Sequence, residues 1–165
     1  MTNSDHFVAV INLHKGIIFK VANSYSKNRE DCKDLAQEII LQVWRSFSNY
    51  KADYQYSTWI YRIALNVAIS YTMKEKLRNL LTQPMSDSIL SLDSEEYDSS
   101  KEQVSRFLHQ FIQELKPLDK ALTLLYLEGK SYQEISEIMG LSETNISTKI
   151  YRIKSVLKQK FSDLK

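Results

Sequence analysis

The chain has 165 residues, a formal net charge of +2 at pH 7, one cysteine and three histidines. This length suits one medium domain or two small ones, and a lone cysteine excludes an internal disulfide framework or a cluster of thiolate metal ligands. The sequence has neither a signal peptide nor an apolar run of spanning length, which favours a cytoplasmic protein without membrane insertion.

The N-terminal part predicts three helices. Apolar residues at helical spacing mark the first over 7–21, with Ser4 or Asp5 as its cap, and the second over about 30–50. The second helix has a largely polar face opposite its apolar stripe, and Leu41 lies on that face. A single exposed leucine is common on protein surfaces, but it also suits a surface that docks another protein. The residues alone leave both interpretations open.

Aromatic side chains are dense in residues 47–61, FSNYKADYQYSTWIY. They can simply pack a loop, or they can offer ring faces on which unpaired bases stack. A third helix, expected to run to about residue 78, carries its apolar stripe through Ile60 and Ala64 and places Arg62 on the opposite side.

A change of composition divides the chain. Residues 82–103 hold six acidic side chains and one basic one, so the rest of the chain is more basic than its net charge suggests. Serines and Pro84 add to the character of a linker. We therefore predict an all-α protein of two small helical domains, 1–81 and 103–165, joined by a flexible acidic linker over 82–102.

The C-terminal domain is predicted to end in a helix-turn-helix. Ser131 and Glu134 form a capping-box pattern, and Gly140 suits a left-handed C-cap. The second of these helices has five basic and no acidic residues between 144 and 160. Such a helix can read the major groove with its first turns and bind phosphates with later basic residues. The alternative is a helical hairpin with a solvated basic face.

No catalytic pattern is present. The sequence lacks a glycine-rich phosphate loop, a G-x-S-x-G elbow and an H-E-x-x-H motif, and its three histidines are scattered. We therefore predict no enzyme activity, no cofactor and no metal site. A small helical nuclease remains the alternative from another class, although the sequence does not supply the clustered carboxylates that it would need.

Two stretches together resemble a known family. Residues 31–71, DCKDLAQEIILQVWRSFSNYKADYQYSTWIYRIALNVAISY, resemble the N-terminal conserved domain of bacterial sigma factors, most closely the extracytoplasmic-function (ECF) group of the sigma-70 family. Residues 115–157, LKPLDKALTLLYLEGKSYQEISEIMGLSETNISTKIYRIKSVL, resemble the promoter-binding C-terminal domain of the same group. The order and spacing of the two stretches also fit. A stand-alone helix-turn-helix regulator is the alternative.

The resemblance implies a role for each exposed surface. The second helix is expected to dock on the RNA polymerase core enzyme through Asp34, Gln37, Glu38 and Leu41. The melted minus-ten element is expected to bind Tyr54, Tyr56, Arg62 and Asn66. The minus-thirty-five element is expected to bind Thr144, Ser147, Thr148, Tyr151 and Arg152. Many family members have an arginine at the position of Ser147, so a different upstream sequence is expected. The implied partners are the core enzyme and promoter DNA; whether an anti-sigma factor also binds is left open by the sequence.

Overall fold

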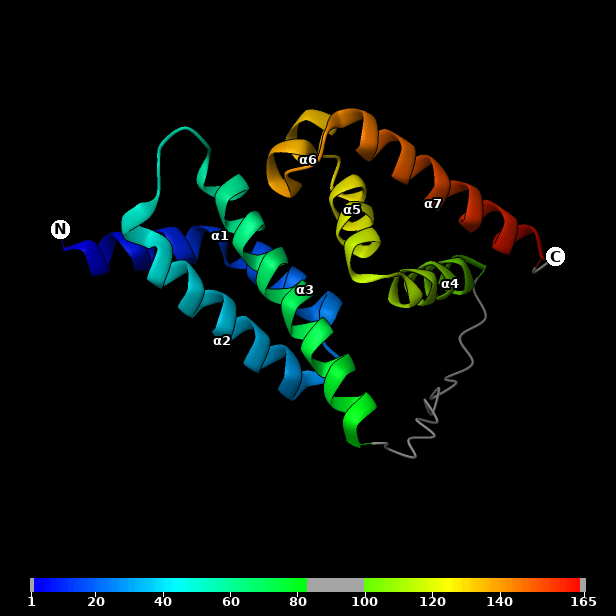
Figure 1. Cartoon of the computed structure of the whole chain (residues 1–165), viewed down its shortest axis with the longest axis horizontal. Coiled ribbons are helices and arrows are strands. Elements are labelled where there is room, and N and C mark those ends of the chain that lie inside the picture. The colour runs from blue at the N-terminus through cyan, green and yellow to red at the C-terminus, as the bar shows by residue number, and fades with distance from the viewer. Residues whose placement is uncertain (1, 83–99, 164–165) are drawn as a thin grey trace.

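The computed structural model describes residues 2–82 and 100–163, and within them the secondary structure is helical (Figure 1). This confirms the all-α class. The predicted linker lies outside the described residues at 83–99, and its last residues begin a helix. The elements are α1 (Asn3–Tyr25), α2 (Arg29–Ser46), the short 3-10 helix η1 (Phe47–Asn49), α3 (Tyr56–Thr82), α4 (Ser100–Glu114), α5 (Pro117–Leu127), α6 (Tyr132–Met139) and α7 (Glu143–Asp163).

Side-chain caps explain where the first helices begin. Thr2, and not Ser4 or Asp5 as the sequence suggested, caps α1. Its hydroxyl accepts a hydrogen bond from the backbone of Asp5, whose carboxylate accepts one in return, so Asp5 occupies the third helical position of a capping box. Asn28 caps α2 by accepting a hydrogen bond of 2.9 Å from the backbone N–H of Asp31.

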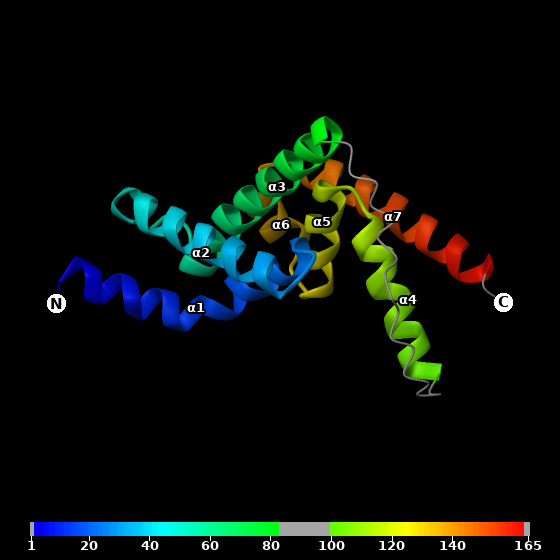
Figure 2. The same ribbon diagram turned by 90° about the horizontal axis from the view of Figure 1, so that it is seen from below.

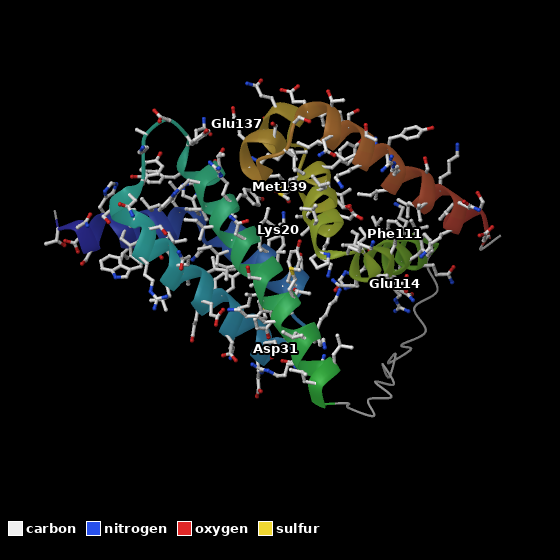
Figure 3. The ribbon with its side chains drawn as sticks, viewed as in Figure 1. Lys20, Asp31, Phe111, Glu114, Glu137 and Met139 are labelled. Carbon is white, nitrogen blue, oxygen red and sulfur yellow. The ribbon has the colours of Figure 1, made fainter. Side chains whose placement is uncertain are left out.

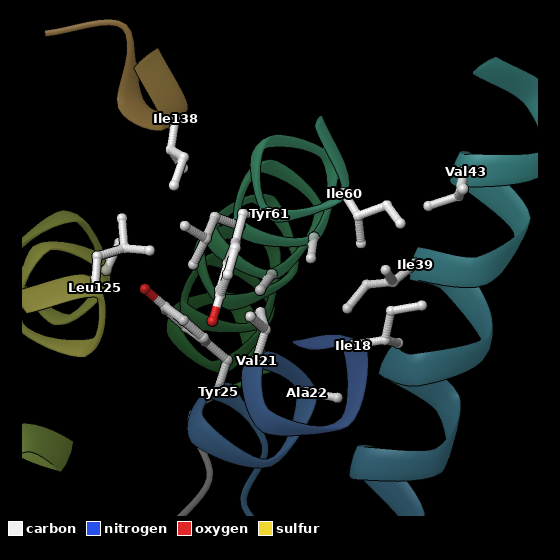
Figure 4. Packing of buried hydrophobic residues seen from close by; sticks show 14 of the residues in the cluster. Ile18, Val21, Ala22, Tyr25, Ile39, Val43, Ile60, Tyr61, Leu125 and Ile138 are labelled. Atoms are coloured by element: carbon white, nitrogen blue, oxygen red, sulfur yellow. The ribbon is translucent and has the colours of Figure 1, made fainter. Parts of the chain in front are cut away.

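The N-terminal core lies where α1, α2 and α3 meet. The largest side chains without solvent exposure there include Leu35 of α2. Ile18 of α1, Ile39 of α2 and Ile60 of α3 are also fully buried, and Figure 4 shows how they lie together. These positions fall on the apolar stripes that the sequence shows. Burying each of these side chains contributes about 1.5–3 kcal/mol relative to exposure.

A second face of α3 packs against the C-terminal helices. Tyr61 and Leu65 are buried on this face, and α5 and α6 lie against it in both views (Figures 1 and 2). Leu125 of α5 and Ile138 of α6 join the same hydrophobic core as the N-terminal residues (Figure 4). The two halves of the chain are therefore in contact over a shared core.

Polar contacts accompany this apolar packing. Glu128 forms an ion pair with Lys20 of α1 and accepts a hydrogen bond of 3.4 Å from the hydroxyl of Tyr61. Lys120 is 7% exposed, and its amine donates to the carbonyl oxygen of Ser24 at 3.2 Å. Because Ser24 lies in the last turn of α1, the ammonium group also meets the negative end of that helix dipole. Burial lowers the pKa of Lys120, and the charge of Lys76 lowers it further.

The outer C-terminal helices form the rest of the second half. In Figure 2, α4 and α7 extend away from the N-terminal helices. The C-terminal end of α7 contacts α4 through the rings of Phe107 and Phe161, whose centres are 5.8 Å apart. The amine of Lys160 lies 3.4 Å from the carboxylate of Glu114, the last residue of α4, which is labelled in Figure 3. Among the helices of the described ranges, none has the length and apolarity to cross a membrane.

Candidate polymerase and nucleic-acid interfaces

The exposed face of α2 is continuous. Asp34, Gln37 and Glu38 are exposed, while Leu35 and Ile39 on the other side are buried. Leu41 is 46% exposed and therefore offers an apolar contact within this polar face. The sequence-derived residue set did not include Trp44, which is also exposed and extends the face by one turn. Its ring packs edge-on against Phe7 of α1 at 4.8 Å, so the indole is held in place at the surface.

An aromatic cluster anchors the loop between α2 and α3. The rings of Tyr50 and Tyr56 are stacked with their centroids 4.2 Å apart, and Phe47 and Trp59 lie beside them. The hydroxyl of Tyr50 donates a hydrogen bond to the carbonyl oxygen of Tyr54. These contacts fix both ends of the loop at residues 50–56. One face of the Tyr56 ring is consequently covered by protein, which leaves less of it for any stacked base.

Tyr54 and Arg62, two residues of the expected minus-ten site, lie in contact. Tyr54 is 39% exposed, and the guanidinium carbon of Arg62 lies 5.4 Å from the centre of its ring. A guanidinium group over an aromatic face is a cation–π contact, which orders both groups. Asn66 is exposed on α3 one turn beyond Arg62. The ring, the positive charge and the amide therefore form one surface.

An open pocket of about 500 Å³ lies in this loop. It is lined by His14, Tyr50, Ala52, Asp53, Tyr54, Gln55, Tyr56 and Ser57. All of these residues except His14 belong to the loop and the start of α3. The walls combine ring faces with hydrogen-bonding groups, the combination that holds unpaired bases in proteins.

The helix-turn-helix has the geometry that the sequence predicted. The Ser131 hydroxyl accepts a hydrogen bond from the backbone of Glu134 at 3.1 Å, and Gly140 adopts a left-handed φ of 72° after α6. Ser142 then caps α7 by accepting from the backbone of Asn145 at 3.1 Å. A side chain at Gly140 would be strained by this backbone conformation, so glycine suits the corner.

The first turns of α7 expose the predicted reading residues. Ile146 and Ile150 are buried, so the exposed set lies on the other side: Thr144, Ser147, Thr148, Tyr151 and Arg152. Tyr151 is 72% exposed. The hydroxyl of Thr148 donates a hydrogen bond of 3.0 Å to the carbonyl oxygen of Thr144, so the hydroxyl hydrogen of Thr148 is already used within the helix. The hydroxyls of this surface therefore differ in how readily they can donate to a base.

Two lysines of α7 contact other helices of the protein. The amine of Lys154 lies 4.2 Å from the centre of the Tyr126 ring of α5, and a hydrogen bond with Tyr126 raises the pKa of Lys154. Lys160 pairs with Glu114 of α4. Arg152 and Lys158 are exposed. The basic residues of the sequence pattern are thus divided between contacts with other helices, α4 and α5, and the outer surface.

The described residues contain no group of three or more histidine, cysteine or carboxylate side chains that could hold a metal ion.

Family models match both halves of the chain. The model for sigma-70 region 2 matches residues 10–78, and the model for sigma-70 region 4 matches residues 107–157. The first match contains α2, the aromatic loop and most of α3, whereas the second contains the helix-turn-helix.

Curated relatives match over most of their length. The chain is 29% identical over 152 residues to the ECF RNA polymerase sigma-E factor of Haemophilus influenzae, covering 83% of this chain and 78% of the relative. It is 28% identical over 142 residues to the RNA polymerase sigma-H factor of Pseudomonas aeruginosa, covering 78% and 72% respectively.

Solved structures share the fold. CnrH in complex with the cytosolic domain of CnrY superposes with a TM-score of 0.66 at 17% identity, covering 98% of this chain and 90% of that one. The sigma factor RpoE of Bartonella quintana, in complex with the anti-sigma factor NepR, superposes with a TM-score of 0.68 at 18% identity, covering 95% and 97%.

Proposed function

The chain belongs to the ECF group of the sigma-70 family, whose members direct bacterial RNA polymerase to promoters, and we propose that three exposed surfaces of this chain divide that task. The observation that carries the proposal is that each family match contains surfaces with the chemistry its role requires. The region 2 match holds the α2 face and the aromatic loop, and the region 4 match holds the exposed turns of α7.

The α2 face is proposed to bind the polymerase core enzyme. Asp34, Gln37, Glu38 and Leu41 supply polar contacts around one apolar contact, and Trp44 adds an ordered aromatic side chain. Protein interfaces commonly derive most of their affinity from a few such apolar or aromatic anchors within a polar surround.

The loop and the start of α3 are proposed to bind the unpaired strand of the minus-ten element. Tyr54 offers an exposed ring, while Arg62 and Asn66 offer a positive charge and an amide beside it. Tyr56 belongs to the same proposed site, but its stacking on Tyr50 gives it a supporting position. A base that leaves the duplex stack loses a few kcal/mol, and stacking on an aromatic side chain returns about 1–3 kcal/mol.

The first turns of α7 are proposed to read the minus-thirty-five element. Ser147, Tyr151 and the other exposed residues of these turns are suited to base edges, and Arg152 to a phosphate or a base. Residues 1–81 and 103–165 are proposed as the two functional units, with 82–102 connecting them.

Further parts of the proposal follow from the family. The protein has no catalysis of its own and acts in the cytoplasm, where it associates with polymerase and promoter DNA. An anti-sigma factor is proposed as a further partner; the similarity to RpoE, a sigma factor solved in complex with one, supports this.

Run-off transcription tests the proposal against its alternatives. The protein is mixed with core RNA polymerase and a library of promoter fragments from a bacterium that encodes it. A sigma factor confers initiation at defined positions that core enzyme alone does not use. A stand-alone regulator would instead bind duplex DNA without supporting initiation, and a nuclease would cut the template.

A further inference from the structure

His14 is the feature of the structure that the proposed function does not use. It lies on α1, more than 30 residues before the loop, yet it lines the same pocket as Asp53, Gln55 and Ser57. Its side chain is half-buried, and its ring centre is 6.5 Å from that of Tyr56. The first helix thus contributes one side chain to a pocket that is otherwise lined by the loop and the start of α3.

The chemistry of His14 suits the recognition of a base edge. Burial lowers the pKa of this imidazole from its ordinary value near 6.5, so the ring is mostly neutral at pH 7. A neutral imidazole presents one N–H donor and one nitrogen acceptor. Each Watson–Crick edge also combines donors and acceptors, and the four bases differ in their order. One nitrogen of His14, held in the pocket wall, can therefore donate to or accept from one group of a base edge and favour the bases that carry that group.

We propose that His14, a residue of α1, determines which base of the unpaired non-template strand the pocket accepts. This inference rests on the proposed minus-ten function of the loop. Tyr54 supplies a ring face, which every base can stack on, so stacking gives affinity without much selection. The selection comes from hydrogen bonds in the pocket wall, where His14 lies with Asp53 and Gln55. A base with the wrong edge offers no partner to the His14 nitrogen and loses the free energy of that hydrogen bond.

The test uses full-length protein, core RNA polymerase and a promoter library randomised across the melted element. Transcripts are sequenced to obtain the base preference at each position. His14→Ala removes the ring, and His14→Phe keeps a ring of similar size without the nitrogens. Leu13→Ala is the matched control, because Leu13 is its neighbour on α1, is 79% exposed and does not line the pocket.

We expect each His14 variant to reduce the base preference at a single position by at least about fivefold. This factor corresponds to the lower end of the discrimination that a good base contact provides. The preferences at other positions and the Leu13→Ala profile should not change. An unchanged motif in His14→Ala overturns the inference, and so does a preference that His14→Phe retains. Uniform weakening at all positions would assign His14 a structural role and also overturn it. If wild-type protein supports no initiation, the proposed function fails first, and that outcome is distinct from the others.

Discussion

The hydroxyl of Tyr25, the last residue of α1, donates a hydrogen bond of 2.6 Å to the carbonyl oxygen of Pro117, the first residue of α5. In the opposite direction, Lys120 of α5 donates to the carbonyl oxygen of Ser24. The amine of Lys120 also lies 5.0 Å from the centre of the Tyr25 ring. Residues far apart in the sequence are thus joined by reciprocal contacts at the ends of two helices.

Tyr25→Phe removes one of these contacts without changing the packing of the ring. We expect the free energy of unfolding to fall by about 0.5–1.5 kcal/mol, the usual net contribution of an intramolecular hydrogen bond. Denaturant titrations followed by circular dichroism measure this change. Tyr151→Phe serves as the control, because the Tyr151 side chain is largely exposed. Equal stability of Tyr25→Phe and wild-type protein would show that the contact contributes nothing.

The same tyrosine should make stability depend on alkaline pH. Burial raises the pKa of Tyr25 well above its ordinary value, whereas the phenol of the unfolded chain ionises near pH 10. Above pH 10 the native state therefore holds more protons than the unfolded state, and the free energy of unfolding falls as pH rises. Tyr25→Phe should show a shallower fall between about pH 9 and 11 in the same denaturant titrations. A slope as steep as that of wild-type protein would contradict this origin.

The sequence alone predicts those parts of the structure that depend on local signals. The helix-turn-helix is specified by a capping residue, a glycine and an apolar stripe within a short stretch, and the structure has Ser131, Gly140 and Ile146 in these roles. The exposed α2 face was predictable for the same reason, because the helical period separates Leu41 from the buried stripe that contains Ile39.

Contacts between distant segments were not predictable in this way. The helix α3 is buried on two faces, so reading a single stripe through Ile60 and Ala64 missed Tyr61 and Leu65. Lys120 resembles a surface residue in the sequence because its partner, the carbonyl of Ser24, is a backbone atom without a sequence signal. His14 enters the pocket only after folding brings α1 beside the loop.

For the polymerase interface, we expect Leu41→Asp to weaken binding to core enzyme by about tenfold or more, since anchor residues contribute roughly 1–3 kcal/mol. The substitution places a charge on an exposed face, so the unfolding midpoint should change little. Leu80→Asp, at a still more exposed leucine of α3, is the matched control and should bind normally. Affinity is measured with labelled protein and purified core enzyme. Normal binding by Leu41→Asp would place the docking surface elsewhere.

For the upstream element, Ser147→Arg is expected to change the base preference. Ser147 is exposed in the first turns of α7, where an arginine could make the bidentate contact to guanine that a serine cannot. A selection over randomised upstream elements should return a motif with a new guanine. Lys160→Ala is a suitable control because Lys160 pairs with Glu114 and lies at the far end of α7. The same motif from Ser147→Arg and wild-type protein would contradict the proposed role.

The aromatic loop should be needed most when the promoter is still double-stranded. Opening the duplex costs base stacking, and the exposed ring of Tyr54 with Arg62 beside it is the surface that can offset this cost. We expect Tyr54→Ala to reduce initiation from a duplex promoter by about tenfold, with a smaller loss on a promoter that is already melted. Tyr56→Ala should also destabilise the loop, because the Tyr56 ring stacks on Tyr50.

The double variant Tyr54→Ala/Tyr56→Ala separates these effects when compared with each single variant. Initiation is measured on duplex and pre-melted templates, and affinity is measured for the isolated non-template strand. Tyr54→Ala should weaken single-strand binding while leaving the unfolding midpoint near that of wild-type protein, because more than a third of its side chain is exposed. The double variant should lower the midpoint as well, through the lost Tyr50–Tyr56 stack. If Tyr54→Ala is equally active on both templates and binds the single strand normally, its ring does not contact the DNA.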